Sequence, residues 1–300
     1  MKTSIAQGNN TPANQNCWLH VLWSDGWCVT MVKKVEYTLF QGRAGDHNDL
    51  TIPGALAIGE ELMRRTGVSP VVVGTPAPAL NAGWRKELDA ALPALRAMQT
   101  RFEHVFAVGA LPISATSRCA VSLATLPVVA KHCPSACVVW FDSHGDLNPP
   151  EESTTGYLGG LVLAGPLGLW DSGLGAGLNL RQVVLVGQRD LDPYELDLIR
   201  LHNIPHIKPG ADYAAELRSA IAGRAVYVHL DCDVLEPGIV PTDYEHEGGL
   251  SLNDLRICCE TIAEHEFVGI EIAEFQNSWE IDGPPVPPTE LLDALGPLIE

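Results

Sequence analysis

The sequence predicts an α/β protein built on one mostly parallel sheet of eight strands, with helices on both faces of the sheet. The first observation is a steady alternation of short apolar runs with segments whose apolar residues recur at helical spacing. The second is the run Val-Val-Trp-Phe at 138–141, which is typical of a strand buried on both faces. The third is that no internal repeat, low-complexity tract or linker divides the body of the chain.

Each element is expected from its own local pattern. Short apolar runs predict strands at residues 35–41, 71–74, 104–109, 136–142, 182–187, 206–208, 225–231 and 268–275. Helical spacing predicts helices at residues 53–66, 84–98, 119–132, 158–169, 193–202, 213–222, 251–266 and 290–299. Several helix ends have clear signals: Gly67 stops the first helix, Pro193 opens another, and Ser251 is a good N-cap.

Residues 1–30 are expected to lie outside the fold, so that a single domain spans residues 31–300. They begin with a polar Gln/Asn/Thr tract and lack the basic start, apolar stretch and cleavage site of a signal peptide. Met31 opens a run that is typical of a natural start followed by a first strand. We expect the first thirty residues to be a disordered or non-native extension.

The charge balance and the cysteines restrict the classes of partner and the compartment. There are 19 basic and 37 acidic residues, giving a net charge of −18, which argues against nucleic acid or an anionic membrane surface as a partner. No apolar run reaches the ~18 residues that a membrane span needs. The eight cysteines, two of them adjacent at 258 and 259, form no disulfide framework, so a reducing cytoplasm is expected.

The run 142–146, Asp-Ser-His-Gly-Asp, directly follows the apolar strand at 136–142. Alternate residues of an extended chain share a face, so Asp142, His144 and Asp146 can converge where the strand leaves the core. Carboxylates and an imidazole together suit Mn, Zn or Fe. The run taken alone is equally consistent with an ordinary polar turn after a strand.

A second stretch, Val-Tyr-Val-His-Leu-Asp-Cys-Asp at 226–233, repeats this design and favours a metal site. His229, Asp231 and Asp233 fall on one face by the same alternation. Buried carboxylates repel one another unless a cation neutralises them. Sites in parallel sheets lie beyond the carboxyl ends of the strands, where these residues fall. We therefore expect two metal ions.

These motifs resemble those of the ureohydrolases, the arginase and agmatinase superfamily, across residues 35–298. The run 142–146 is similar to the family's Asp-Ala-His-x-Asp signature, and 231–237 to its Asp-x-Asp-x-x-Asp-Pro signature. Gly-Gly-Leu-Ser at 248–251 and Glu-Ile-Ala-Glu at 271–274 match later segments in order. The resemblance implies a three-layer α/β/α fold, two Mn²⁺ ions, hydrolysis of a guanidino carbon–nitrogen bond in a small molecule, and a homo-oligomer, a trimer or hexamer.

Together the motifs and the resemblance give a set of candidate site residues. The metal ligands are expected to be Cys119, Asp142, His144, Asp146, Asp231 and Asp233. Asp146 is expected to hold a proton and pass it to the leaving nitrogen, and Glu274 to pair with the guanidinium. The resemblance to arginase assigns Asn148, Thr155 and Asp192 to the amino-acid end of the substrate.

Each of the last four residues also has a structural interpretation. Asn148 and Thr155 can bond the local backbone, as such residues do in loops. Asp192 would be a good N-cap before Pro193, and Glu274 can form a structural salt bridge.

The chain departs from the family pattern at three places. Cys119 stands where the first ligand histidine of the family belongs, and Arg118 replaces an acid. If Cys119 binds the metal as a thiolate, it would favour Zn or Fe at this site. Alternatively, Cys119 is a buried helix residue and the first ion is weakly held. The arginase histidine that relays protons aligns with Gly159, and the loop 242–247 is unusually acidic. The candidates to replace the relay are His229, His246 and His47.

The missing relay leads to a hypothesis about the substrate. An N-hydroxyl group lowers the basicity of a guanidine and eases departure of the nitrogen, so an N-hydroxyarginine-like substrate is expected to be turned over better than arginine. Two alternatives remain: a non-catalytic member that binds a ligand or regulates a partner, and a hydrolase of another amidino or formimino compound.

Overall fold

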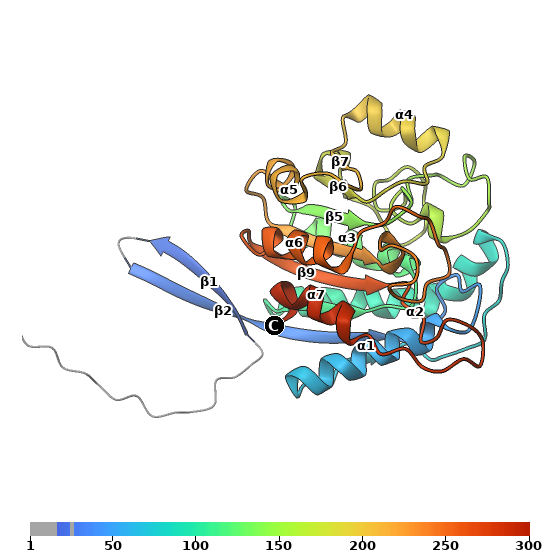
Figure 1. Cartoon of the computed structure of the whole chain (residues 1–300), viewed down its shortest axis with the longest axis horizontal. Coiled ribbons are helices and arrows are strands. Elements are labelled where there is room, and N and C mark those ends of the chain that lie inside the picture. The colour runs from blue at the N-terminus through green and yellow to red at the C-terminus, as the bar shows by residue number, and fades with distance from the viewer. Residues whose placement is uncertain (1–16, 25–26) are drawn as a thin grey trace, which may run out of the picture.

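A parallel sheet forms the centre of the molecule in this computed structural model, which describes residues 17–24 and 27–300 (Figure 1). The order of its strands across the sheet is β3-β2-β4-β9-β8-β5-β6-β7, and these eight strands are parallel. Their bounds are Trp27–Phe40 (β2), Val71–Val73 (β3), Leu111–Ala115 (β4), Cys137–Phe141 (β5), Val183–Val186 (β6), His206–Ile207 (β7), Val226–Asp231 (β8) and Phe267–Ala273 (β9).

Helices cover both faces of this sheet, so the predicted α/β/α fold is confirmed. The helices of the described residues are Thr51–Thr66 (α1), Trp84–Ala107 (α2), Ser122–His132 (α3), Pro193–His202 (α4), Tyr213–Ile221 (α5), Leu252–Ile262 (α6) and Thr289–Ile299 (α7). Buried residues of α1, α5, α6 and α7 form one core with the sheet, and those of α2, α3 and α4 form a second core.

The strand β5 shows why its sequence is apolar throughout. Cys137, Val139 and Phe141 pack into the core on one face of the sheet. Val138 and Trp140 pack into the core on the other face. Because alternate side chains point to opposite faces, a strand between two helical layers needs apolar residues at every position.

The expected strand at 104–109 is wrong, because α2 continues to Ala107 and β4 begins only at Leu111. Leu95, Met98, Phe102 and Val105 continue the helical spacing and are all fully buried. Because this buried face continues at helical spacing, the helix extends across the short apolar run that was predicted to be a strand.

The expected helix at 158–169 is also wrong. The structure has a 3-10 turn, Gly159–Leu161, followed by further turns. Pro166 lacks a backbone N–H, and Gly168 has a φ of 74°, so neither favours a regular helix here. The segment instead folds onto the loop after β5, where the backbone N–H groups of Leu163 and Ala164 both donate to the Asp146 carbonyl, each at 3.0 Å.

The N-terminal segment forms a hairpin that projects from the body of the molecule (Figure 1). The strand Cys17–Ser24 (β1) pairs in antiparallel fashion with residues 27–34, the first part of β2. From Val35 onward β2 pairs with β4 inside the parallel sheet. Residues 1–16 and 25–26 of the predicted extension lie outside the described residues, so its placement outside the fold remains a proposal.

None of the helices in the described residues combines the length and the apolar character that crossing a bilayer requires.

Candidate active site

Four neighbouring strands end at one edge of the sheet, and candidate site residues stand at or after the end of each. β4, β9, β8 and β5 are adjacent and parallel, so their carboxyl ends meet at this edge. Cys119 follows β4 in the 3-10 turn Cys119–Val121, and Glu274 follows β9. Asp231 ends β8, and Asp142 follows β5. The topology therefore brings together residues that are far apart in the sequence.

One group of potential metal ligands consists of Asp142, His144 and Asp233, whose ligand atoms lie within 4.8 Å of one another. The Nδ1 atom of His144 is 3.2 Å from Asp142 Oδ1 and 3.1 Å from Asp233 Oδ2. Burial would lower the pKa of His144, but the contacts with the two carboxylates outweigh burial and raise it. The positive imidazole thus compensates two buried negative charges, which a divalent cation at the same place would also do.

A second group consists of Cys119, Asp231 and Glu274, again with ligand atoms within 4.8 Å of one another. The Cys119 thiol donates to Asp231 Oδ2 at 3.0 Å, and the Cys119 backbone N–H donates to Glu274 Oε1 at 2.8 Å. Burial, followed by the charge of Asp231, raises the pKa of the Cys119 thiol well above its usual value. A cation would be needed to stabilise the thiolate here.

The buried carboxylates repel one another. Burial raises the pKa of Asp146 and of Asp231 well above the usual value, and the charges of neighbouring carboxylates raise it further. Among the described residues, Asp146 belongs to none of the groups of three ligand atoms, although it lines the same cavity. So many buried acids beside one cavity are the electrostatic pattern of a cation site.

Asp146 and Glu274 both have a left-handed backbone, with φ values of 54° and 65°. This conformation costs a residue other than glycine about 1 kcal/mol or more, so neighbouring contacts must maintain it. The Asp146 carbonyl accepts the two hydrogen bonds from Leu163 and Ala164, and the Glu274 N–H donates to the Ser117 carbonyl at 3.3 Å. The strain therefore falls on the two residues that were predicted to be catalytic.

A cavity of about 280 Å³ opens over this edge of the sheet. Of the ten predicted site residues, nine line it and only Asp142 does not. Asp142 lies behind the wall, fully buried, where its Oδ2 accepts a hydrogen bond from Trp140 Nε1 at 3.0 Å.

The three residues predicted for the amino-acid end of a substrate line the cavity and also make local hydrogen bonds. The amide of Asn148 donates to Asp192 Oδ2 at 2.8 Å, while its Oδ1 is buried without a hydrogen-bond partner. Thr155 Oγ1 accepts from the backbone N–H of Tyr157 at 3.2 Å. Asp192 is the N-cap of α4, in a capping box with Glu195. The structural and the substrate-binding interpretations are therefore compatible for these residues.

Tyr157 fills the space beside Gly159, the position that the resemblance aligns with the relay histidine. A Cβ atom added at Gly159 would lie only 2.3 Å from the Tyr157 Cε1 atom. Tyr157 lines the cavity together with Tyr244, and its ring packs on that of His47 with 4.0 Å between centroids. No local pattern in the sequence predicts this contact, because nothing near Tyr157 indicates that its ring turns back toward position 159.

Arg118 gives Glu274 a partner that was not anticipated. Its Nη1 atom donates to Glu274 Oε2 at 2.9 Å and to Asp243 Oδ2 at 2.7 Å. Arg118 is completely buried, while Glu274 and Asp243 both line the cavity. The unusual Arg118 and the acidic loop 242–247 are both visible in the sequence, but only the fold shows that they pair.

The three histidines considered as relays have different surroundings. His229 is completely buried and therefore cannot exchange protons with solvent in the cavity. His246 lines the cavity, and its Nε2 is 3.3 Å from Asp190 Oδ2. His47 is not among the residues that line the cavity, and its Nδ1 is 3.5 Å from Asp243 Oδ2. Of the three, His246 is best placed to exchange protons at the cavity.

Comparison with known proteins agrees with this geometry. The profile of the Arginase family matches residues 42–283. A relative, the N(omega)-hydroxy-L-arginine amidinohydrolase of Streptomyces lavendulae, is 38% identical over 266 residues, covering 89% of this chain and 97% of the relative. The chain belongs to the arginase family.

Solved arginases have the same fold as this family member. The arginase of Bacillus cereus superposes with a TM-score of 0.75 at 23% identity, covering 89% of this chain and 98% of its own. The arginase of Entamoeba histolytica, solved with L-ornithine, superposes with a TM-score of 0.75 at 20% identity, covering 88% of this chain and 97% of its own. The three-layer architecture is thus that of the arginases.

Arginase-family enzymes are metal-dependent hydrolases of amidino groups, and this chain is a hydrolase of that kind. Its residues fit a divalent metal centre on chemical grounds. Two groups of three potential ligand atoms lie beside one cavity, and they contain four carboxylates, an imidazole and a thiol. Carboxylates and imidazole suit Mn²⁺, and a thiol adds affinity for softer ions such as Zn²⁺.

Proposed function

We propose that this protein hydrolyses the guanidino carbon–nitrogen bond of N-hydroxy-L-arginine or a closely similar N-substituted arginine. The products would be ornithine and hydroxyurea or a related substituted urea. The observation that carries the proposal is the 38% identity to the Streptomyces lavendulae enzyme over 97% of its length, combined with Gly159 at the position of the relay histidine, where the Tyr157 ring fills the space. A weakly basic guanidine has the least need of that relay.

The amino-acid end of the substrate is proposed to bind at the side of the cavity formed by Asn148, Thr155 and Asp192. Asn148 Oδ1 is an unused acceptor, and the Asp192 carboxylate can accept from the α-amino group. Thr155 can donate its hydroxyl to the α-carboxylate. These contacts would direct the guanidine toward the acidic end of the cavity and hold it there for attack.

The metal centre is proposed to hold two divalent ions. Asp142, His144 and Asp233 would hold one of them, for which Mn²⁺ is the proposed metal, and Cys119 and Asp231 would contribute to the other. Bound ions would supply a water molecule of lowered pKa close to the guanidine carbon. Asp146 would receive the proton of that water and transfer it to the departing nitrogen.

Assembly and compartment are proposed from the same resemblance. We propose a homo-oligomer, a trimer or a hexamer, in the cytoplasm. The unpaired thiols among the described residues, such as the fully buried Cys258 and Cys259, are consistent with a reducing compartment.

The test is a comparison of kcat/KM for N-hydroxy-L-arginine and L-arginine, with hydroxyurea, urea and ornithine measured separately. We expect the N-hydroxy substrate to be preferred by at least about tenfold, and two ions per chain by elemental analysis. Asp146→Asn should lower kcat by about a hundredfold or more, because the proton carrier is lost. Asn148→Ala, which keeps the metal groups intact, should mainly raise KM.

Two outcomes would contradict the proposal. A strong preference for L-arginine would assign the protein to the ordinary arginases. A purified protein that binds no metal and hydrolyses neither compound would favour a non-catalytic role.

A further inference from the structure

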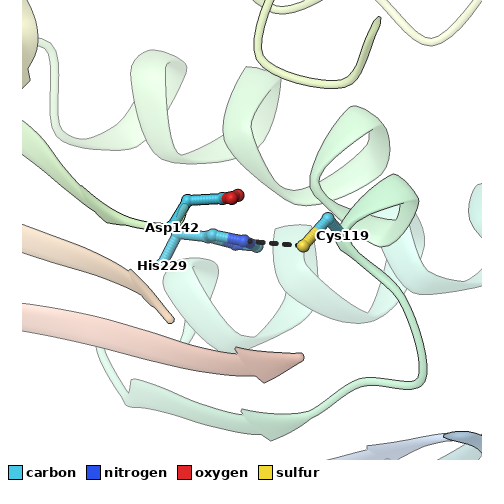
Figure 2. Close-up of side chains that lie close together, drawn as sticks. All are labelled: Cys119, Asp142 and His229. Atoms are coloured by element: carbon cyan, nitrogen blue, oxygen red, sulfur yellow. Dashed lines mark hydrogen bonds between the residues drawn. The ribbon is translucent and has the colours of Figure 1, made fainter. Parts of the chain in front are cut away.

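His229 lies where a ligand of the metal centre would lie, although the family signature does not use this position. The residue is on β8, two residues before Asp231, and its side chain is completely buried. Figure 2 shows His229 and Cys119 facing each other, with Asp142 beside them. The Nε2 atom of His229 is 3.2 Å from Cys119 Sγ, and ligand atoms of all three residues lie within 4.8 Å of one another.

The opposite side of the imidazole is held by hydrogen bonds that direct Nε2 toward this group. His229 Nδ1 is 3.0 Å from Glu271 Oε1 and 3.0 Å from Ser122 Oγ. Glu271 is further fixed by Ser122 and by Thr125, which donate to its two oxygens at 2.7 Å each. A carboxylate that accepts from Nδ1–H leaves the Nε2 lone pair free, and metal-bound histidines are usually held in this way.

The position of the ring is also fixed by packing. The imidazole stacks on the Trp140 indole with 3.6 Å between centroids and an angle of 8° between the planes. Trp140 in turn donates to Asp142 Oδ2, so one side chain positions two members of the group. The cysteine at position 119 is much smaller than the histidine that the family pattern has there, and the His229 ring reaches its sulfur.

We propose that His229 Nε2, Cys119 Sγ and one oxygen of Asp142 bind one of the two metal ions. The imidazole that the family pattern supplies at position 119 is supplied here by β8. A site with one thiolate, one imidazole and one carboxylate selects Zn²⁺ or Fe²⁺ over Mn²⁺, whereas the group of Asp142, His144 and Asp233 lacks sulfur and suits Mn²⁺. Asp142 belongs to both groups and is therefore available to either ion. This inference deepens the proposed function, on which it rests, by assigning ligands and a metal class to the same site.

The experiment uses the full chain loaded with Zn²⁺ and Mn²⁺, because X-ray absorption at the two metal edges observes the two ions separately. The zinc edge should show one sulfur and one imidazole nitrogen, and the manganese edge should show no sulfur. His229→Asn should remove the imidazole contribution at the zinc edge and weaken Zn²⁺ binding by about a hundredfold, measured by competition with a chelator. His206→Ala, on β7 away from the site, is the matched control and should keep both ions.

A second variant keeps the test decisive if His229→Asn does not fold. In the Co²⁺-substituted protein, Cys119→Ser should remove the sulfur-to-metal charge-transfer absorption in the near ultraviolet while the ion remains bound. A zinc edge without sulfur or without imidazole in the unmodified protein would overturn the inference. If His229→Asn keeps both ions at unchanged affinity while N-hydroxyarginine is still hydrolysed, the inference fails and the proposed function stands. If no metal binds and nothing is hydrolysed, both fail.

Discussion

Arg118 is a buried cation that holds two carboxylates of the cavity wall, Glu274 and Asp243. Glu274 was expected to pair with a substrate guanidinium, but both of its oxygens already accept hydrogen bonds, one from Arg118 and one from the Cys119 backbone. A second guanidinium would therefore approach an existing one. An N-hydroxyl substituent lowers the basicity of a guanidine, so such a substrate binds more readily in its neutral form and would avoid this repulsion.

Replacing Arg118 should therefore change substrate preference. In Arg118→Met, kcat/KM for L-arginine should rise relative to that for N-hydroxy-L-arginine by on the order of tenfold, since the negative charge of Glu274 becomes available to a cation. The measurement is the ratio of the two kcat/KM values in the metal-loaded protein. Arg118→Lys keeps the charge and is the control; its ratio should stay close to that of the unmodified protein. An unchanged ratio in the Met variant would show that Arg118 has only a structural role.

At the scale of the element, the start of α4 couples helix capping to the site. Glu195 Oε2 accepts from the Asp192 N–H at 2.9 Å, and Oε1 accepts from the Leu147 N–H, also at 2.9 Å. Burial raises the pKa of Glu195 to about 7, although these two hydrogen bonds lower it. One carboxylate thus holds both the N-cap of α4 and the loop that carries Asp146.

The raised pKa of Glu195 predicts a pH dependence of stability. Between about pH 4.5 and pH 7 the folded chain binds a proton that the unfolded chain has lost, so the free energy of unfolding should rise as the pH falls through this window. Across this window, protonation of Glu195 should raise the free energy of unfolding by about 3 kcal/mol in total.

Urea unfolding at several pH values measures this contribution as the difference between the unmodified protein and Glu195→Gln. As the pH falls from 8 to 5, the free energy of unfolding of the unmodified protein should rise relative to that of Glu195→Gln. Glu216→Gln, at an exposed position in the first turn of α5, is the control and should have little effect at any pH. A difference for Glu195→Gln that is the same at pH 5 and pH 8 would contradict the prediction.

The sequence predicts some strands and helices more accurately than others, and the differences have physical causes. β5 and β8 were predicted within a residue or so, because central parallel strands must be apolar on both faces. The end of α2 was missed, because residues 104–107 satisfy both a strand pattern and the last turn of a buried helical face. The segment at 158–169 was missed because its apolar residues pack on the site loop rather than along a helix axis.

The candidate site was predictable to the extent that it follows strand ends. Cys119, Asp231 and Glu274 converge as expected, because the carboxyl ends of parallel strands share one edge of the sheet. The contacts of Arg118 with Asp243 and of Tyr157 with the space at Gly159 depend on how loops fold back over that edge. No local pattern in the sequence encodes such contacts.

At the scale of the whole molecule, the N-terminal hairpin should be dispensable. Residues 17–24 pair with residues 27–34, whereas the sheet of the body begins at Val35. A chain that starts at Met31 should keep its kcat/KM and change its free energy of unfolding by less than about 1 kcal/mol. Thermal unfolding and the substrate assay measure this.

A chain that starts at Gly42 is the matched control for this truncation. It removes β2 from between β3 and β4, and it should fail to fold. Aggregation or loss of activity in the chain that starts at Met31 would show that the hairpin belongs to the functional protein.

The two strands that supply most of the carboxylates, β5 and β8, are neighbours in the middle of the sheet, held between β6 and β9. The loops that carry Thr155, Tyr157 and Asp243 also line the cavity. In the proposed function, the strand ends would therefore supply the chemistry and the loops would supply the selectivity. Mutations in these loops would then be expected to exchange one guanidine substrate for another while the hydrolytic residues are kept, which would give evolution a direct route to new substrates.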